Sequence, residues 1–270
     1  MPEGTVDPIE AAACDDVLRE CRQGDCFVGD RPFVQRALID GEEHWVEESV
    51  LGLVLVSQTC DIVRSPEDRP SVTMCPLVEV DEAQYSLVAK GYMPRYAALP
   101  GVSARRLVAD LDRSMTVDKT VMVRWERIAG VSNDIEGRAF ALALSRKASR
   151  FAFPDDFNEY VAPLAKRLRE KHDKQSPEGN ALRALAEVRV MAEPHWDAPE
   201  VDLTFYFIRE QDAVAEFDGK PWLVWAEKWM ALLTNSARFK NPHPIVQDHA
   251  TMIVAEYLQS DQLDLEHLSA

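Results

Sequence analysis

The chain has 270 residues, with 46 Asp and Glu against 30 Lys and Arg, and its formal net charge is −16. This length accommodates one large domain or two small ones with a sizeable apolar core. The acidity argues against a protein that coats nucleic acid in general, because displacing counterions from phosphates needs an excess of Lys and Arg, and it disfavours anionic membranes.

The expected location follows from the apolar runs and the cysteines. No apolar run has the length of a membrane span, and the N-terminus lacks the charge and apolar pattern of a signal peptide. The five cysteines, an odd number without framework spacing, are typical of a reducing compartment. We therefore expect a cytoplasmic, prokaryotic protein that is not membrane-bound.

Residues 1–130 are expected to form a helix followed by a β-rich domain. Asp7-Pro8 is an N-cap followed by a helix-initiating proline, and it predicts a helix over about 8–22. Asp40-Gly41 predicts a tight hairpin turn. Pro76 removes a ladder donor, which indicates an edge strand or a bulge. Short strands are expected at 26–28, 33–39, 44–47, 51–58, 71–80, 96–99 and 107–111, and a short helix at 81–90; 121–125 fits either type.

This spacing of short strands indicates a strongly curved sheet or a small barrel. Residues 131–270 are expected to form a helical segment and a small α+β region, with one core shared by the two portions as the alternative. Trp222, Trp225 and Trp229 recur at helical spacing, which favours a core face over a base-stacking platform. Helices are expected at 133–150, 157–171, 180–186 and 222–233, with strands at 188–192 and 201–208, and 245–254 is ambiguous.

The sharpest candidate site follows the aliphatic run 51–56. Ser57-Gln58-Thr59-Cys60-Asp61 places a hydroxyl, an amide, a thiol and a carboxylate at a strand end, where scaffolds often present chemistry. Cys60 could act as a nucleophile with His44 as base and Asp61 or Ser57 assisting. The alternative is that Cys60 is a small buried apolar residue and Asp61 caps the turn.

A pair of cysteines and a group of cationic side chains are further candidate sites, and each also has a simpler structural explanation. Cys60 and Cys75 could face each other across neighbouring strands as a disulfide or half a metal site, but the chain has no CxxC pair or zinc-ligand spacing. We therefore predict no metal and no cofactor. Arg146, Lys147 and Arg150 could bind phosphate or a partner, or could simply complement the dipole of the helix they end.

Several well-marked enzyme classes are not indicated. The chain contains no GxxxxGK[ST], GxGxxG, HExxH or GxSxG motif. Nucleotide-driven enzymes and the common hydrolases are therefore not expected.

The order of motifs over about residues 22–80 resembles the MazF/PemK-like family of SH3-like barrels. The resemblance rests on a Gly-Asp-opened strand at 23–28, an aliphatic strand ending in Ser57, and a strand containing Pro76. It implies an SH3-like barrel, sequence-selective RNA cleavage, and a setting in toxin–antitoxin or other conflict systems. The catalytic pattern departs from the family's, because Glu47-Glu48-Ser49 stands where the family has Arg-Pro, and Leu77-Val78-Glu79 where it has a hydroxyl.

Two hypotheses of function follow. The first is a non-enzymatic accessory protein of a prokaryotic conflict system, such as toxin–antitoxin or phage defence, which binds a protein partner or, as a further option, RNA, with 57–61 as a recognition or structural site. The second is an enzyme, either a diverged MazF-like endoribonuclease or a Cys60-dependent hydrolase. The missing catalytic set favours the first. The sequence does not indicate an oligomeric state.

Overall fold

The computed structural model describes residues 8–91, 93–149 and 151–263 and divides the chain into two compact units, Met1–Ser149 and Arg150–Ala270. The division falls about twenty residues after the predicted boundary near 130. The reason is that helix α5 (Asp134–Ala148) buries Phe140 in the N-terminal core, beside Leu99 and Val102. No helix in the described ranges is long and apolar enough to cross a membrane.

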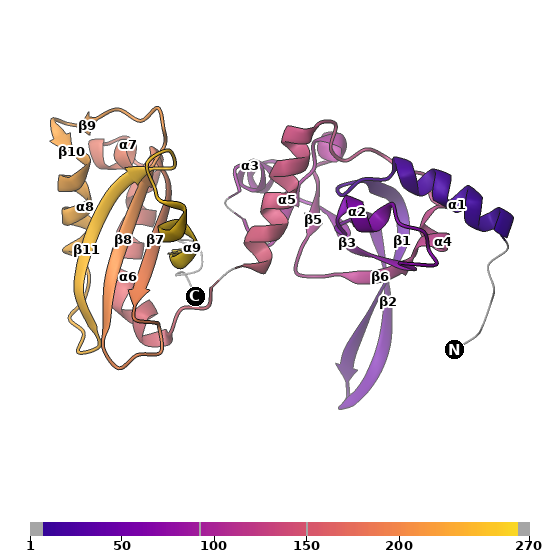
Figure 1. The fold of residues 1–270 in the computed structure, drawn as a ribbon, viewed down its shortest axis with the longest axis horizontal. Coiled ribbons are helices and arrows are strands. Elements are labelled where there is room, and N and C mark those ends of the chain that lie inside the picture. Colours follow the sequence, from indigo (N-terminus) through magenta and orange to yellow (C-terminus); the bar gives the residue numbers. More distant parts are fainter. Residues whose placement is uncertain (1–7, 92, 150, 264–270) are drawn as a thin grey trace. The chain divides into compact units, whose positions relative to one another are not determined.

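The N-terminal unit is a mixed α+β structure built around an antiparallel sheet (Figure 1). Its strands are β1 (Cys26–Ile39), β2 (Glu42–Leu55), β3 (Ser71–Glu79), β4 (Tyr96–Ala98), β5 (Leu107–Asp110) and β6 (Met115–Asp118). Its helices are α1 (Pro8–Glu20), α2 (Thr59–Ile62), α3 (Glu82–Ala89), the 3-10 turn η1 (Pro100–Arg105), α4 (Lys119–Met122) and α5. The strand order is β1-β2-β3-β5-β4, with β6 also paired to β3, and the pairings of the described strands do not close the sheet.

The hairpin turn at Asp40-Gly41 is confirmed. Both residues have positive φ, 53° and 84°, which is the requirement of the tight hairpin turn that joins twisted strands. The strands on either side are much longer than predicted, because 26–39 and 42–55 each form one continuous strand with a bulge between Val28 and Arg31. The outer part of these strands is a ribbon exposed on both faces, where period-two alternation of apolar and polar residues is not required.

Pro76 lies neither in an edge strand nor at a bulge, the two alternatives that the sequence predicted. Strand β3 is central and changes neighbours along its length: β6 pairs with it up to Met74, and β5 pairs with it from Leu77 onward. Pro76 falls between these two ladders, so the missing N–H costs no hydrogen bond with either neighbour on that side.

The sheet forks beside this proline. Strand β2 pairs with β3 only over Leu53–Leu55, and beyond Gly52 it continues with β1 as a separate ribbon. Gly52 has a φ of 153°, and a Cβ at this position would lie 2.8 Å from the backbone oxygen of Phe27. The divergence therefore depends on glycine, because any side chain here would press on the neighbouring strand.

Three apolar clusters lie in the described part of the N-terminal unit, the smallest of them around Val80, Val88 and Val108, and the two larger ones hold its helices on the sheet. One lies under α1, α2 and α4 and includes Leu18, Phe27 and Ile62. The other lies between the sheet and α5 and includes Val54, Leu77 and the buried thiols of Cys26 and Cys75. Burial on this scale contributes roughly 1.5–3 kcal/mol for each large apolar side chain.

The C-terminal unit is a four-stranded sheet with its three longer helices on one face, while the short helix that carries Tyr257 lies against Arg189 on the other. Strand β11 runs parallel to β8, while β7 is antiparallel to β8 and to the short β12. Its elements are α6 (Asp155–His172), α7 (Pro177–Arg183), β7 (Leu185–Glu193), β8 (Val201–Arg209), β9 (Glu216–Phe217), β10 (Lys220–Pro221), α8 (Trp222–Met230), β11 (Phe239–Asp248), α9 (Val254–Gln259) and β12 (Asp261–Gln262).

The three tryptophans of α8 belong to the core of this unit. Trp222, Trp225 and Trp229 are at most 5% exposed and pack with α6 and β8 side chains such as Phe205 and Phe207. The base-stacking alternative is therefore wrong, because a platform for bases needs exposed ring faces. The prediction that their helical spacing marks a face of the core is confirmed.

Candidate functional site

The side chains of the strand-end motif are largely engaged within the N-terminal unit. Ser57 Oγ accepts a hydrogen bond from the backbone N–H of Thr73 at 2.8 Å, and Thr59 Oγ1 accepts one from Gln23 at 3.1 Å. The carboxylate of Asp61 lies 3.8 Å from the guanidinium of Arg69. These contacts hold the chain as it leaves β2 and enters α2, so Ser57 is a structural anchor.

A buried lysine, which no sequence motif marked, supports the same loop. Lys119 is 0% exposed, and its Nζ donates to the backbone oxygens of Asp61 and Arg64, both at 2.7 Å. Burial lowers the pKa of this amine, while the nearby Asp61 carboxylate opposes the shift. Lys119 thus satisfies carbonyls at the end of α2, a role that ordinarily falls to a helix cap.

Cys60 is exposed, and Cys75 is buried. The proposal that they form a disulfide or share a metal is therefore wrong: both thiols are free, and Cys75 lies in the apolar cluster under α5. Burial raises the pKa of Cys75 to about 12, with Asp110 adding to the effect, so this thiol is inert at neutral pH. The expectation that Cys60 is a buried apolar residue is also wrong, since Cys60 is exposed and its Sγ donates to Oε1 of the Gln58 side chain at 3.6 Å.

His44 lies far from Cys60. It is paired with Ala37 near the tip of the hairpin, eleven residues before β2 ends at Leu55. A strand rises roughly 3.3 Å per residue, which separates His44 from the end of β2 by roughly 35 Å. Figure 1 shows the hairpin tip pointing away from α2. Since His44 is the only histidine before residue 172, the structure places no histidine of this unit beside Cys60.

One side chain of the cationic cluster at the end of α5 is already engaged within the N-terminal unit. Lys147 Nζ is ion-paired with Asp112. The Arg146 side chain packs against Gly91, where an added Cβ would lie 2.7 Å from Nη1. Arg150 lies outside the described residues. The ion pair between Lys147 and Asp112 connects α5 to the loop after β5.

The most exposed feature of the N-terminal unit is the distal hairpin, residues 34–47, which we call the arm. From Val34 to Glu47 no residue is buried, whereas Phe33 and Val50 at its base are. Trp45 is 70% exposed and Leu38 is 72% exposed. An exposed tryptophan beside other apolar side chains on a projecting ribbon is typical of a surface that is covered by a partner.

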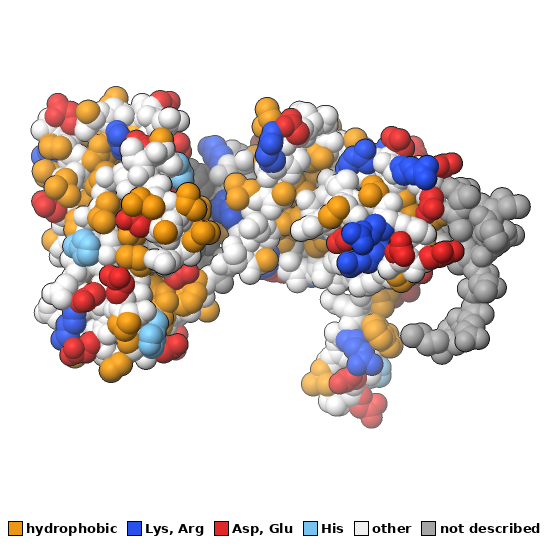
Figure 2. All heavy atoms as spheres, in the orientation of Figure 1, with side chains coloured by type: hydrophobic (Ala, Val, Ile, Leu, Met, Phe, Trp, Pro, Cys, Tyr) orange, Lys and Arg blue, Asp and Glu red, His pale blue; other side chains and the backbone are white. Residues whose placement is uncertain are grey.

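One face of the arm gathers these side chains. The register pairs Arg36 with Trp45 and Leu38 with Glu43, and alternate residues of a strand share a face. The Arg36 guanidinium stacks over the Trp45 ring at 4.8 Å and is ion-paired with Glu43 at 2.9 Å. Figure 2 shows hydrophobic and acidic side chains together on the arm. One signal in the sequence could have identified this face of the arm: Trp45 stands among acidic residues directly after the predicted turn at Asp40-Gly41.

The arm is strongly acidic. Between Val34 and Glu47 it carries four carboxylates against one guanidinium, a formal net charge of −3. The carboxylates are Asp40, Glu42, Glu43 and Glu47. A surface of this sign repels nucleic-acid phosphates and attracts a cationic protein surface.

The fold and these surfaces define the N-terminal unit as an open, antiparallel α+β domain with a projecting acidic arm. Comparison with protein-family models and with curated protein sequences finds no match for this chain.

Proposed function

We propose that this is a non-enzymatic partner-binding protein that uses the arm to grip a protein with a cationic, partly apolar surface. The observation that carries the proposal is the exposed Trp45–Arg36–Leu38 face on a ribbon without a covering layer. Tryptophan and arginine dominate binding hot spots, and the surrounding carboxylates supply long-range attraction. The partner is accordingly a protein and not RNA.

The arm also has a physical reason to be covered. A two-stranded ribbon exposed on both faces is only marginally stable by itself. Its outer edges offer unpaired backbone groups, which attract further strands or a partner chain. Binding a partner would bury the apolar face and rigidify the ribbon at once. The motif at 57–61 then acts as a structural support at the base of the unit and not as the recognition site.

We do not propose an enzymatic activity for Cys60 or for the ribonuclease-like region. Nucleophilic catalysis needs a base within hydrogen-bond reach of the thiol, and Cys60 has Gln58 as its contact. The cellular setting remains part of the proposal: an accessory role in a cytoplasmic, prokaryotic conflict system, with the N-terminal sheet as an opened relative of the SH3-like barrel. It is supported by the order of motifs over 22–80.

Replacing Trp45 by alanine is expected to abolish partner capture without unfolding the protein. The ring is 70% exposed, so its loss changes the free energy of unfolding by about 0.5 kcal/mol or less, whereas loss of a hot spot costs about 2 kcal/mol or more of binding free energy. The measurement is quantitative affinity capture from a lysate of the source cells, with bound proteins identified by mass spectrometry.

The matched control is Ile135→Ala, which removes a side chain that is 73% exposed on α5. A protein captured by the wild type and by Ile135→Ala, but not by Trp45→Ala, supports the proposal. Its retention should fall as salt is raised to about 0.5 M, because the attraction between exposed charges is screened. Equal capture by Trp45→Ala and the wild type would refute the arm as the binding element.

A further inference from the structure

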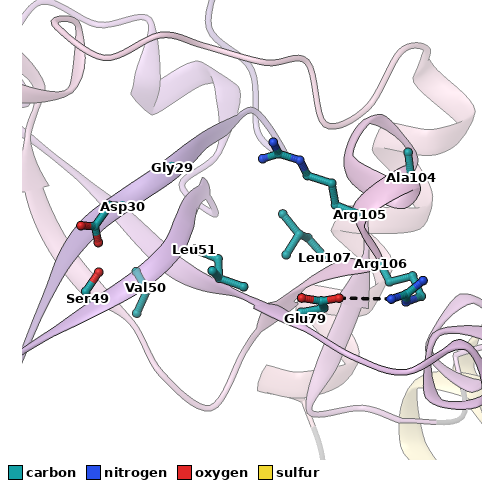
Figure 3. A pocket seen from close by; sticks show the side chains of 10 residues that line it. All are labelled: Gly29, Asp30, Ser49, Val50, Leu51, Glu79, Ala104, Arg105, Arg106 and Leu107. Carbon is teal, nitrogen blue, oxygen red and sulfur yellow. Dashed lines mark hydrogen bonds and ion pairs between the residues drawn. The ribbon is translucent and has the colours of Figure 1, made fainter.

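A second candidate site lies where the sheet forks, at the base of the arm and away from its tip. A cavity of about 560 Å³ opens here between β2 and the β3–β5 strands (Figure 3). Its lining includes Asp30, Leu51, Glu79, Arg105 and Leu107. The volume falls within the range of about 300–1,000 Å³ typical of ligand-binding pockets.

The first wall of this fork is an open strand edge of β2. The backbone N–H of Leu55 donates to Asp25, and its carbonyl accepts from Gly24, so the polar groups of Leu55 face β1. Because successive residues of a strand direct these groups to opposite sides, Gly52 turns its own towards the fork. Beyond the bulge in β1, the register runs unbroken from Ile39–Glu42 to Arg31–Val50, so the groups of Val50 face β1 and those of Ser49 face the fork. No strand of the described chain pairs with β2 on that side beyond Leu53.

The opposite wall is an open edge of β3. The N–H of Val80 donates to the carbonyl of Arg106 at 3.2 Å, so even-numbered residues here face β5. The same alternation turns the backbone groups of Leu77 and Glu79 towards the fork. Two strand edges therefore face one cavity, and their polar groups need water or an added strand as a partner.

The side chains in the fork are chemically distinct. Figure 3 shows Leu51 and Leu107 directed towards its middle, with the Arg105 side chain reaching over them. Glu79 is ion-paired with Arg106 at 3.1 Å, whereas the structure gives Arg105 and Asp30 no partner among the described residues. The fork thus offers an apolar floor, one unpaired cation on one side and one unpaired carboxylate on the other.

We infer that the fork binds an extended peptide segment, which adds to the edge of β2 as a strand and directs a carboxylate to Arg105. The backbone edge supplies affinity for a strand, and the floor at Leu51 and Leu107 accepts an apolar side chain at an alternate position. Asp30 repels a carboxylate on the other wall and so sets the direction of the segment. This site does not depend on the arm or on its partner.

The test uses three acetylated, amidated and fluorescein-labelled hexapeptides on the full-length protein. In the first, valine and threonine alternate around one central glutamate; the second has lysine in place of the glutamate; the third is the first with alternate backbone amides N-methylated. Fluorescence anisotropy measures each affinity. The glutamate peptide should bind at least about tenfold more tightly than the lysine peptide, since a charge-assisted hydrogen bond is gained.

Arg105→Glu should reverse this preference, and N-methylation should remove binding, because it blocks donation to the strand edge. Trp45→Ala should leave all three affinities unchanged, which separates this site from the arm. Absence of binding by the glutamate peptide, equal binding of the N-methylated peptide, or an unchanged preference in Arg105→Glu would each overturn the inference. Arg105→Gln provides a neutral second variant, in which the preference for the glutamate peptide should be lost.

Discussion

Glu178→Gln is expected to lower the free energy of unfolding of the C-terminal unit by about 2–3 kcal/mol, because it dismantles a largely buried ionic network. Glu178 is 7% exposed. Its two oxygens accept from Arg167 at 3.0 and 2.7 Å, and they also accept from Lys228 and from the Trp229 indole, both at 3.2 Å. Glutamine keeps the shape but sets an NH₂ group against two cations.

The effect of Glu178→Gln should shrink in acid. Burial opposes ionisation of Glu178, but hydrogen bonds from Arg167 and Lys228 outweigh it, so its pKa lies below the ordinary value of 4.5. A depressed folded pKa means that stabilisation is complete above the unfolded value and is lost as the pH falls through the folded value. The gap between wild type and variant should therefore be full at pH 7 and narrow below about pH 4.5.

Urea unfolding followed by tryptophan fluorescence measures this difference, since four of the six tryptophans lie in the C-terminal unit. The control is Glu170→Gln on α6, whose carboxylate is 58% exposed and 3.9 Å from Lys166. Exposed pairs of this kind contribute about 0–1 kcal/mol. Equal effects of the two substitutions would show that the Glu178 network contributes no more to the free energy of unfolding than an exposed ion pair does.

Asp110→Asn is expected to cost about 3 kcal/mol or more in the N-terminal unit, because Asp110 is 0% exposed and holds two arginines. Arg95 makes a bidentate contact with its carboxylate at 3.1 and 3.0 Å, and Arg113 makes a third at 3.0 Å. Arg113 is also paired with Glu48 near the base of the arm. The loss should therefore loosen the attachment of the arm as well as β5.

Hydrogen exchange of peptides covering 53–55 and 107–110 measures this loss, since global opening controls exchange in a core strand. The control is Asp16→Asn, whose side chain is 78% exposed and pairs only along α1 with Arg19. Burial raises the pKa of Asp110, but the two arginines lower it by more, so the pKa lies below its ordinary value. The contribution of Asp110 to the free energy of unfolding is therefore lost only in acid. Unchanged exchange in Asp110→Asn would contradict the structural role.

Much of the secondary structure follows from local patterns in the sequence. Asp81 caps α3 through a capping box with Gln84, and Asn133 caps α5 through Ile135 and Glu136. Such signals lie within four residues of each other and need no knowledge of the fold. The division between units did not follow, because only the packing of Phe140 onto the first core assigns α5 to it.

The candidate site was less predictable because it depends on distance in space. A strand-end run of polar residues looks the same whether its side chains face a substrate or bond to neighbouring backbone, as Ser57 does with Thr73. Lys119 lies 58 residues from Asp61 in sequence, yet its side chain donates a hydrogen bond to the backbone oxygen of Asp61. Local patterns did not reveal that β2 is one strand of fourteen residues, and it is this length that separates His44 from Cys60.

The central claim is that the arm is the element that binds a partner, and hydrogen exchange measured by mass spectrometry tests it most directly. The comparison is between the isolated protein and its purified complex with a protein captured through Trp45. The arm, exposed on both faces, should exchange quickly when free, and residues 34–47 should gain more protection in the complex than any other segment. Unchanged exchange in the arm, with protection appearing elsewhere, would contradict the account.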